Sequence, residues 1–150
     1  MRRLALLACA VALGGCGLGS GAPDTSLRLL VTEDFGTTPL EELDTPESTE
    51  SDTVMRMLMR NTAVETSQGG GFVESINGRA GGREAGRPFD WFYYVNGVEA
   101  SEGAASVKLR PSDRVWWDRH DWGATQMIPA VVGSFPEPFL HGYDGSRLPS

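Results

Sequence analysis

Cysteine is scarce in this sequence: two of its 150 residues are cysteines, Cys9 and Cys16, and both lie near the N-terminus. The chain after Cys16 therefore has no thiol, which excludes disulfide bonds, zinc–thiolate sites and cysteine nucleophiles from that region. Lysine is limited to Lys108, the arginines are scattered, and 20 acidic residues outnumber 13 basic ones. Because nucleic-acid binding needs a concentrated basic face, we expect no nucleic-acid partner.

A long hydrophobic run is also lacking. The apolar stretch at residues 4–13 is too short to span a bilayer, which takes about 20 apolar residues in a helix. Two arginines precede this stretch and two glycines and Cys16 follow it, so residues 1–15 are predicted to be a cleavable export signal. The boundary resembles a bacterial lipobox, which implies that Cys16 is lipidated and anchors an exported protein to the outer side of a bacterial membrane. The alternative is an ordinary secreted protein cleaved near Ala8 or Ala10.

The remaining length is enough for one domain and too short for two. Residues 16–26 combine the proposed lipidated cysteine with a stretch rich in Gly, Ser, Ala and Pro, a composition typical of a flexible tether. We predict a folded domain at residues 27–122 and a Pro- and Gly-rich C-terminal extension at residues 123–150.

The first half of this domain predicts a strand, a loop and one helix. Residues 27–32 are rich in branched side chains and form the first predicted strand. Residues 33–52 are polar and contain Gly and Pro, so we expect a solvated loop; their acids lack the spacing of a calcium-binding loop. Beyond a polar cap, Val54, Met57 and Leu58 recur at helical spacing. This pattern predicts a short amphipathic helix that packs on a sheet.

Turn residues divide the second half into further strands. Residues 72–76 alternate like a strand and end at Asn77-Gly78, which favours a turn. Residues 78–86 are rich in glycine and arginine and are predicted to be a mobile loop. A last strand is predicted at residues 114–118, after a Pro-Ser-Asp turn.

The clearest local signal is a β-hairpin over residues 91–100. Its turn is Asn96-Gly97, a pair that tolerates the positive φ angles of a type I′ turn. Alternation then places Trp91 on the apolar, core-facing side and Phe92 and Tyr94 on the opposite side. We expect that second side either to be a poorly hydrated surface or to contact a partner.

Aromatic residues gather in one part of the chain, since all four tryptophans lie between residues 91 and 122. This excess suggests a platform for a flat or partly apolar ligand, and packing alone is the alternative. Asp118 and His120 share a face of an extended strand, which makes a metal site or an acid–base pair conceivable. A surface ion pair is the plainer interpretation, and no Gly-x-Ser-x-Gly nucleophile motif occurs. We therefore expect a protein that is not an enzyme.

Several of these segments together resemble a known family. The segment Gly71–Gly78, the hairpin strand Trp91–Gly97, the triplet Glu102–Ala104 and the run Val115–Trp117 are similar to the transcobalamin-like C-terminal domain. Its bacterial members are mostly catalogued as a domain of unknown function. The resemblance implies an α+β, β-grasp-like fold over residues 27–122, with one helix packed on a mixed sheet.

The resemblance also implies a ligand. In intrinsic factor and transcobalamin this domain is the smaller of two that close around cobalamin. The matching positions imply seven ligand-binding residues in this sequence: Ser75, Ile76, Asn77, Trp91, Phe92, Tyr94 and Asn96. Alternation places Trp91 in the core whereas the resemblance makes it a ligand contact, and both roles stay open.

From these observations we expect a non-enzymatic, membrane-anchored binding module outside the cytoplasm, with no required cofactor, catalytic residue or metal. Its ligand would be cobalamin, another corrinoid or another small planar molecule. The alternative is a structural module that offers its aromatic residues to an envelope protein or to a cell-wall polymer.

Overall fold

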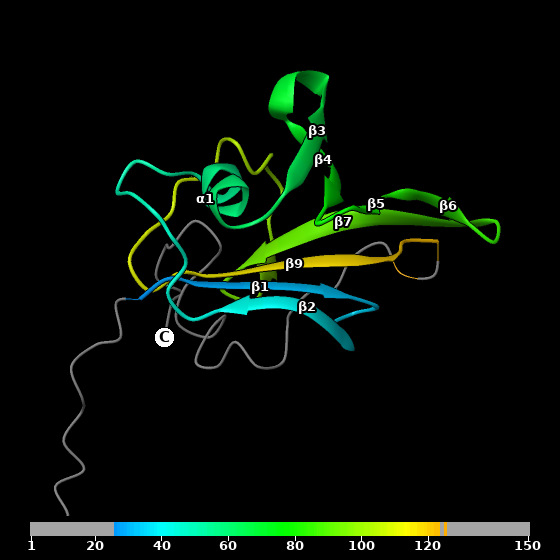
Figure 1. The fold of residues 1–150 in the computed structure, drawn as a ribbon, viewed down its shortest axis with the longest axis horizontal. Coiled ribbons are helices and arrows are strands. Elements are labelled where there is room, and N and C mark those ends of the chain that lie inside the picture. Colours follow the sequence, from blue (N-terminus) through cyan, green and yellow to red (C-terminus); the bar gives the residue numbers. More distant parts are fainter. Residues whose placement is uncertain (1–25, 124, 126–150) are drawn as a thin grey trace, which may run out of the picture.

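The computed structural model describes residues 26–123 and residue 125. The predicted signal peptide, Cys16, most of the tether and nearly all of the C-terminal extension lie outside the described residues. Within the described part, no helix is long and apolar enough to cross a membrane. The elements are β1 Arg28–Glu33, β2 Thr38–Leu43, α1 Val54–Asn61, β3 Val64–Ser67, a 3-10 turn at Gln68–Gly70, β4 Phe72–Ile76, β5 Arg79–Ala80, β6 Gly82–Glu84, β7 Arg87–Val95, β8 Val98–Glu99 and β9 Arg114–Asp121 (Figure 1).

The strands form two sheets, one larger and one smaller. The larger sheet has the order β2-β1-β9-β7-β6, with β8 paired to β7. Strands β1 and β9 run parallel and the other pairs run antiparallel, so the sheet is mixed. The smaller sheet has the order β3-β4-β5. Figure 1 shows α1 and the β3–β4 pair on the same side of the larger sheet. One helix on a mixed sheet confirms the predicted α+β fold class.

Helix α1 forms for the reasons that its sequence gives. Thr53 caps it, because its Oγ1 accepts a hydrogen bond from the backbone N–H of Arg56 at 3.4 Å. Val54, Met57 and Leu58 are fully buried, as the helical spacing predicts. Each buried apolar side chain of this size contributes about 1.5–3 kcal/mol, so this face fixes the helix on the sheet.

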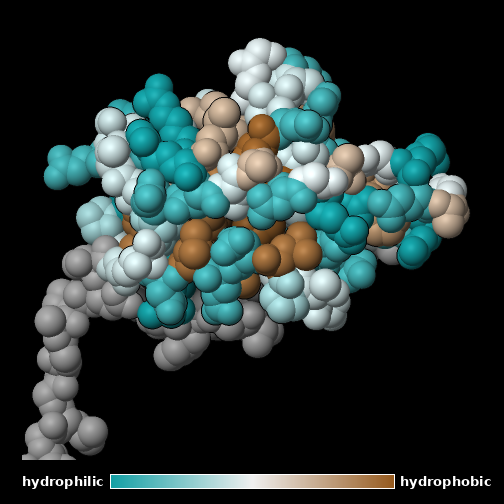
Figure 2. Space-filling model, in the orientation of Figure 1, coloured by the Kyte–Doolittle hydropathy of each residue, from teal (hydrophilic) through white to brown (hydrophobic). Residues whose placement is uncertain are grey.

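The core lies between α1, β4 and one face of the larger sheet. Alternate residues of the three central strands point into it, and the helix and β4 close it from above. Its principal members are Leu29, Val31, Val54, Met57, Leu58, Val73, Ile76, Trp91, Tyr93, Val95, Val115 and Trp117. Figure 2 shows hydrophobic residues emerging near the middle of the molecule, interrupted by hydrophilic ones, with no unbroken apolar patch in that view.

The predicted hairpin is confirmed in turn type and register. Asn96 and Gly97 have φ angles of 53° and 82°, as a type I′ turn requires. Tyr94 pairs with Glu99 and Val95 pairs with Val98. The Asn96 side chain also fixes this turn to the rest of the sheet. It donates to Asp113, which precedes β9, and accepts from the backbone N–H of Arg114 at the start of β9.

Two predicted loops are wrong. Residues 33–52 contain β2, which forms a hairpin with β1 through a turn at residues 34–37. Strand β2 is an edge strand, where Pro39 is tolerated because its missing N–H leaves no ladder bond unmade. Residues 78–86 form β5 and β6, which pair with β4 and β7. In both stretches the strands are stabilised by partner strands that a polar, glycine-rich composition does not reveal.

Candidate functional site

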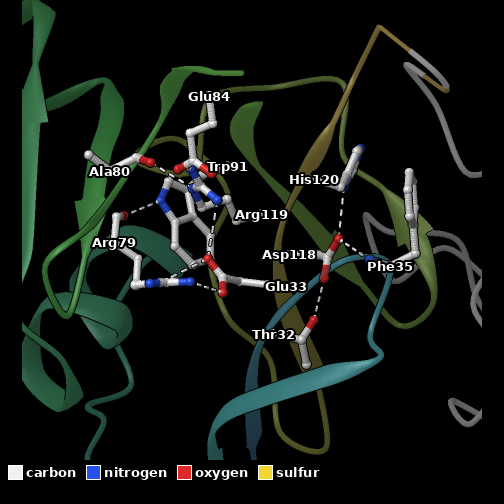
Figure 3. A network of polar contacts seen from close by, with 10 residues as sticks. All are labelled: Thr32, Glu33, Phe35, Arg79, Ala80, Glu84, Trp91, Asp118, Arg119 and His120. Carbon is white, nitrogen blue, oxygen red and sulfur yellow. Dashed lines mark hydrogen bonds and ion pairs between the residues drawn. The ribbon is translucent and has the colours of Figure 1, made fainter. Parts of the chain in front are cut away.

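The candidate site lies at the C-terminal end of β9, which occupies the centre of the larger sheet. Successive residues of this strand point to opposite sides (Figure 3). Arg119 lies on the side of α1, whereas Asp118 and His120 lie on the other side. Strand β9 also extends beyond the predicted end at residue 118, so His120 is part of the sheet.

Asp118 is held by four hydrogen-bond donors and is fully buried. Its Oδ1 accepts from the backbone N–H of Gly36 at 3.0 Å and from the Thr32 hydroxyl. Its Oδ2 accepts from the backbone N–H of Phe35 at 3.0 Å and lies 2.8 Å from Nδ1 of His120. Four donors match the acceptor capacity of an ionised carboxylate, which cannot itself donate. The proton of the last pair therefore belongs to Nδ1 of His120.

The imidazole of His120 is stacked between two phenylalanine rings. The ring centroids lie 4.4 Å from Phe35 and 4.3 Å from Phe92, with interplanar angles of 25° and 17°. The side chain is fully buried, and Nε2 has no hydrogen-bond partner among the described residues. In the neutral imidazole with its proton on Nδ1, Nε2 carries a lone pair, and no neighbour in the described chain bonds to this atom.

The same face continues along β7 and β9 through a second stacked pair. The Trp116 indole N–H donates to the Thr32 hydroxyl at 2.7 Å, and the Tyr94 ring stacks on Trp116 with a centroid distance of 4.4 Å. Burial raises the pKa of the Tyr94 hydroxyl above its usual value, and this hydroxyl also has no partner within the described part of the chain. We call this surface the histidine face; it consists of Thr32, Phe35, Phe92, Tyr94, Trp116, Asp118 and His120.

On the opposite side, Arg119 belongs to a buried charge cluster (Figure 3). Its Nη1 donates to Glu33 at 3.2 Å, its Nε donates to the Ala80 carbonyl at 2.6 Å, and its Nη2 pairs with Glu84. Arg79 adds two bonds to the Glu33 carboxylate, at 3.0 and 2.5 Å. Glu33 and Arg119 are both buried. The cluster connects β5 of the smaller sheet and β6 to the central strands of the larger sheet. Its members lie far apart in the chain, so no local pattern predicts it.

Five of the seven predicted ligand-binding residues use their side chains within the fold. Ser75 is buried and donates to Glu65 at 2.9 Å, and Ile76 is fully buried in the core. Asn77 is exposed at the β4–β5 turn, where its Oδ1 accepts from the backbone N–H of Ala63 at 3.0 Å. These three residues therefore lie on the smaller sheet, away from the histidine face.

The remaining predicted residues divide between the core and the histidine face. Trp91 lies in the core, where its indole N–H donates to the Arg79 carbonyl at 2.9 Å, as alternation predicted. Asn96 is buried and bonds Asp113 at 2.9 Å. Phe92 and Tyr94 lie together on the histidine face, on the side that alternation assigned to them.

Hollows lie elsewhere on the described surface, among them a smaller and a larger one. The smaller, of about 340 Å³, is acidic; burial raises the pKa of its Asp90 above the usual range. The smaller hollow is lined by Glu65, Phe72, Glu74, Ala80, Gly81, Gly82 and Asp90. No group of three potential metal ligands occurs among the residues described. The larger, of about 580 Å³, is lined by Ser26, Leu27, Thr45, Pro46, Ser48, Thr49, Glu50, Leu109, Arg110 and Pro111.

A comparison with known families identifies part of this domain. Residues 51–121 match the model of a domain of unknown function, DUF4430. The match runs from the residues that precede α1 to the end of β9, so it includes Asp118 and His120. Strands β1 and β2, which supply Thr32 and the Phe35 turn, lie outside it. No curated protein and no solved structure matches the chain.

Proposed function

We propose that this protein is a lipid-anchored, non-enzymatic binding module outside the cytoplasm, and that its histidine face takes a planar ligand such as cobalamin. One observation carries the proposal. His120 Nε2 and the Tyr94 hydroxyl are buried on one aromatic face without a partner among the described residues. Groups of this kind point to a molecule that completes their hydrogen bonds or coordination.

Leaving a buried polar group unpaired is energetically unfavourable. The penalty is about 1–3 kcal/mol for each group, and folded proteins pair the great majority of such groups. On the core side, the Trp91 indole donates to the Arg79 carbonyl and the Tyr93 hydroxyl donates to the Glu102 carbonyl. Trp117 Nε1 is the exception on that side. The histidine face differs from the core side in holding two unpartnered aromatic polar atoms, His120 Nε2 and the Tyr94 hydroxyl.

The aromatic composition of the face favours a flat ligand. Phe35, Phe92 and the imidazole already form a stack, and Phe35 is 40% exposed. Aromatic rings at such spacings bind flat, partly apolar molecules by offset stacking, and a few polar groups fix their orientation. The resemblance to the transcobalamin-like C-terminal domain supports cobalamin as the first ligand to test.

The described geometry supports binding over catalysis. Asp118 and His120 are arranged like the base and its orienting carboxylate in a hydrolase. In a hydrolase triad the base is bonded to a nucleophilic hydroxyl, and no hydroxyl within the described residues is bonded to Nε2. We therefore assign the pair to ligand recognition.

Titration of the mature protein with aquocobalamin, followed by tryptophan fluorescence, tests the ligand. We expect saturable quenching, because Trp116 lies on the histidine face beside Tyr94. Phe92→Leu should weaken binding by up to about tenfold by removing one side of the stack, since an aromatic pair contributes about 0.5–1.5 kcal/mol. Phe72→Leu is the matched control, since Phe72 is 41% exposed on β4 of the other sheet.

Two results would contradict the ligand assignment. The first is the absence of saturable quenching up to high micromolar concentrations. The second is equal affinity of the Phe92→Leu and Phe72→Leu variants for aquocobalamin. Capture of an envelope protein or a cell-wall polymer by the same protein, unaffected by corrinoids, would support the interaction module instead.

The anchor is tested separately. Cys16→Ser should move the protein from the membrane fraction to the soluble exported fraction and abolish labelling by a fatty-acid analogue. Cys9→Ser is the control, because Cys9 lies within the predicted signal peptide. Release of the wild-type protein without any label would favour simple secretion.

A further inference from the structure

The histidine face is buried although it lies outside the core. Tyr94, Asp118 and His120 are 0% exposed, and Trp116 is 7% exposed. None of these four residues belongs to the core cluster, which lies on the opposite side of the same strands. Something must therefore shield this side of the larger sheet from water.

The described elements shield only part of this side. Among them, α1 and the β3–β4 pair lie on the core side of the larger sheet (Figure 1). On the histidine face the turn after β1 reaches β9, where Phe35 stacks on His120 and a Cβ added at Gly36 would lie 3.5 Å from the Trp116 ring. Tyr94 lies one strand further from that turn, on β7. The complete burial of Tyr94 therefore requires a further occupant of this face.

The chain leaves the described part at the margin of this face. Strand β9 ends at Asp121, and the backbone N–H of Trp122 donates to the Pro88 carbonyl at 3.1 Å. Residues 126–150 follow. Paired strands lie about 4.8 Å apart and an extended chain advances about 3.3 Å per residue, so roughly six extended residues span the width of the path β2-β1-β9-β7-β6. The segment is long enough to cover the face.

The composition of residues 126–150 suits a segment that packs on an aromatic surface. It opens with the uninterrupted apolar run Met127–Val132. Further large apolar or aromatic side chains follow at Phe135, Phe139, Leu140 and Tyr143. Formal charges are few, at Glu137, Asp144 and Arg147. A stretch with this much apolar surface and so little charge is stabilised by contact with another apolar surface.

From these observations we propose that residues 126–150 of the same chain cover the histidine face. The segment also offers donors and acceptors to His120 Nε2 and the Tyr94 hydroxyl, which lack a partner among the described residues. The inference goes beyond the proposed function and does not require it. A ligand of this face must first displace the segment, so residues 126–150 regulate access to the face.

Photo-cross-linking of the full mature chain tests which segment covers the face. The photoreactive residue p-benzoylphenylalanine takes the place of Phe92, and mass spectrometry maps the products. We expect cross-links within one chain, from position 92 to residues 126–150. The same group in place of Phe72 is the matched control, since Phe72 is 41% exposed on the smaller sheet and should give no cross-link to this segment.

Hydrogen–deuterium exchange of the wild-type protein does not depend on how a variant folds. We expect backbone amides within residues 126–140 to exchange roughly tenfold or more slowly than those of a free peptide with the same sequence, because packing protects amides from exchange. Exchange at the rate of the free peptide throughout residues 126–150 would overturn the inference.

Charges placed in the apolar run give an independent measurement. Val131→Asp combined with Val132→Asp should lower the melting temperature by roughly 5 °C or more, because two shielded apolar side chains become charged. Ser146→Asp combined with Ser150→Asp adds the same charge at polar positions and should change the melting temperature by no more than about 1 °C. Equal melting temperatures of the two double variants would overturn the inference.

The cross-links also separate the candidate occupants of the face. Cross-links from position 92 to a second chain would overturn the inference in favour of a dimer, and cross-links confined to residues 26–123 would overturn it as well. Aquocobalamin titration of the wild-type protein and of the Val131→Asp, Val132→Asp variant tests access, and we expect tighter binding by the variant. Equal affinity would overturn the regulation of access. If neither protein binds aquocobalamin, the proposed function fails, while the cross-links and the exchange rates still decide whether the segment covers the face.

Discussion

Glu33→Gln is the perturbation whose outcome follows most directly from the structure. The substitution keeps the size of the side chain and removes the negative charge between Arg79 and Arg119. In the native protein the Glu33 carboxylate accepts three charged hydrogen bonds, at 2.5, 3.0 and 3.2 Å. Its side chain is only 7% exposed, so water cannot replace the lost charge.

The expected loss of stability is large because Arg119 remains charged and buried. Its side chain is 5% exposed, and after the substitution it keeps the Ala80 carbonyl and Glu84, whose side chain is 60% exposed. Removing one partner of a buried ion pair destabilises a protein by about 3–5 kcal/mol. A domain of this size has a free energy of unfolding of roughly 5–15 kcal/mol. We therefore expect Glu33→Gln to remove a large part of the total.

Glu84→Gln is the matched control, since it deletes the exposed carboxylate of the same cluster. Arg119 then keeps Glu33, and the loss should be about 1 kcal/mol or less, as for surface ion pairs. Urea unfolding at neutral pH, followed by tryptophan fluorescence, gives both values from the midpoint and slope. Losses that agree within about 1 kcal/mol would refute the argument that burial makes Glu33 the essential anion.

Three further outcomes follow from burial and backbone geometry. Met57→Ala should lower the free energy of unfolding by about 2–5 kcal/mol and Met59→Ala by less than about 0.5 kcal/mol, because Met57 is fully buried and Met59 is 53% exposed; equal losses in thermal melts would contradict the assigned helix face. An arginine side chain lowers the pKa of Asp52, so its ionised form stabilises the fold above the ordinary value of 3.8, and this contribution is lost as pH falls through the lower folded value. Burial raises the pKa of Asp90, so Asp90→Asn should increase the free energy of unfolding at pH 7 and lose this advantage in acid. Asp52→Asn should decrease the free energy of unfolding at pH 7 and make no difference in strong acid. Changes of the same sign at pH 7 in both variants would show that the two environments are misassigned. Gly97→Ala should cost about 1–2 kcal/mol in urea unfolding, because φ at this position is 82°; an unchanged midpoint would mean that the turn relaxes.

Local patterns predicted the elements that depend on few long-range contacts. The helical spacing of Val54, Met57 and Leu58 predicted α1 and its buried face. The Asn96-Gly97 turn predicted the hairpin and its register, because its backbone conformation matches the twist of paired strands. Alternation also placed Trp91 in the core and Phe92 on the other side, in agreement with the structure.

The missed strands show where such patterns fail. Strand β2 and strands β5 and β6 consist of polar, proline-containing or glycine-rich segments, and β2 and β6 lie at the two edges of the larger sheet. Edge strands often carry charged residues and proline, because these keep the unpaired backbone groups of the edge from pairing with other chains. Their stability comes from hydrogen bonds to partner strands, and composition carries no record of those partners.

The sequence by itself determined the helix, the hairpin and the shared side of Asp118 and His120, because the periods of helices and strands are fixed by backbone geometry. The α+β fold class was what the family resemblance implied. Only the tertiary structure decided what that shared side became. Three of the four donors to Asp118 come from residues 32–36, which lie 82 to 86 positions earlier in the chain. The parallel pairing of β1 with β9 brings these donors next to Asp118. Asp118 is thereby held in place, and it fixes the orientation of the buried His120 imidazole.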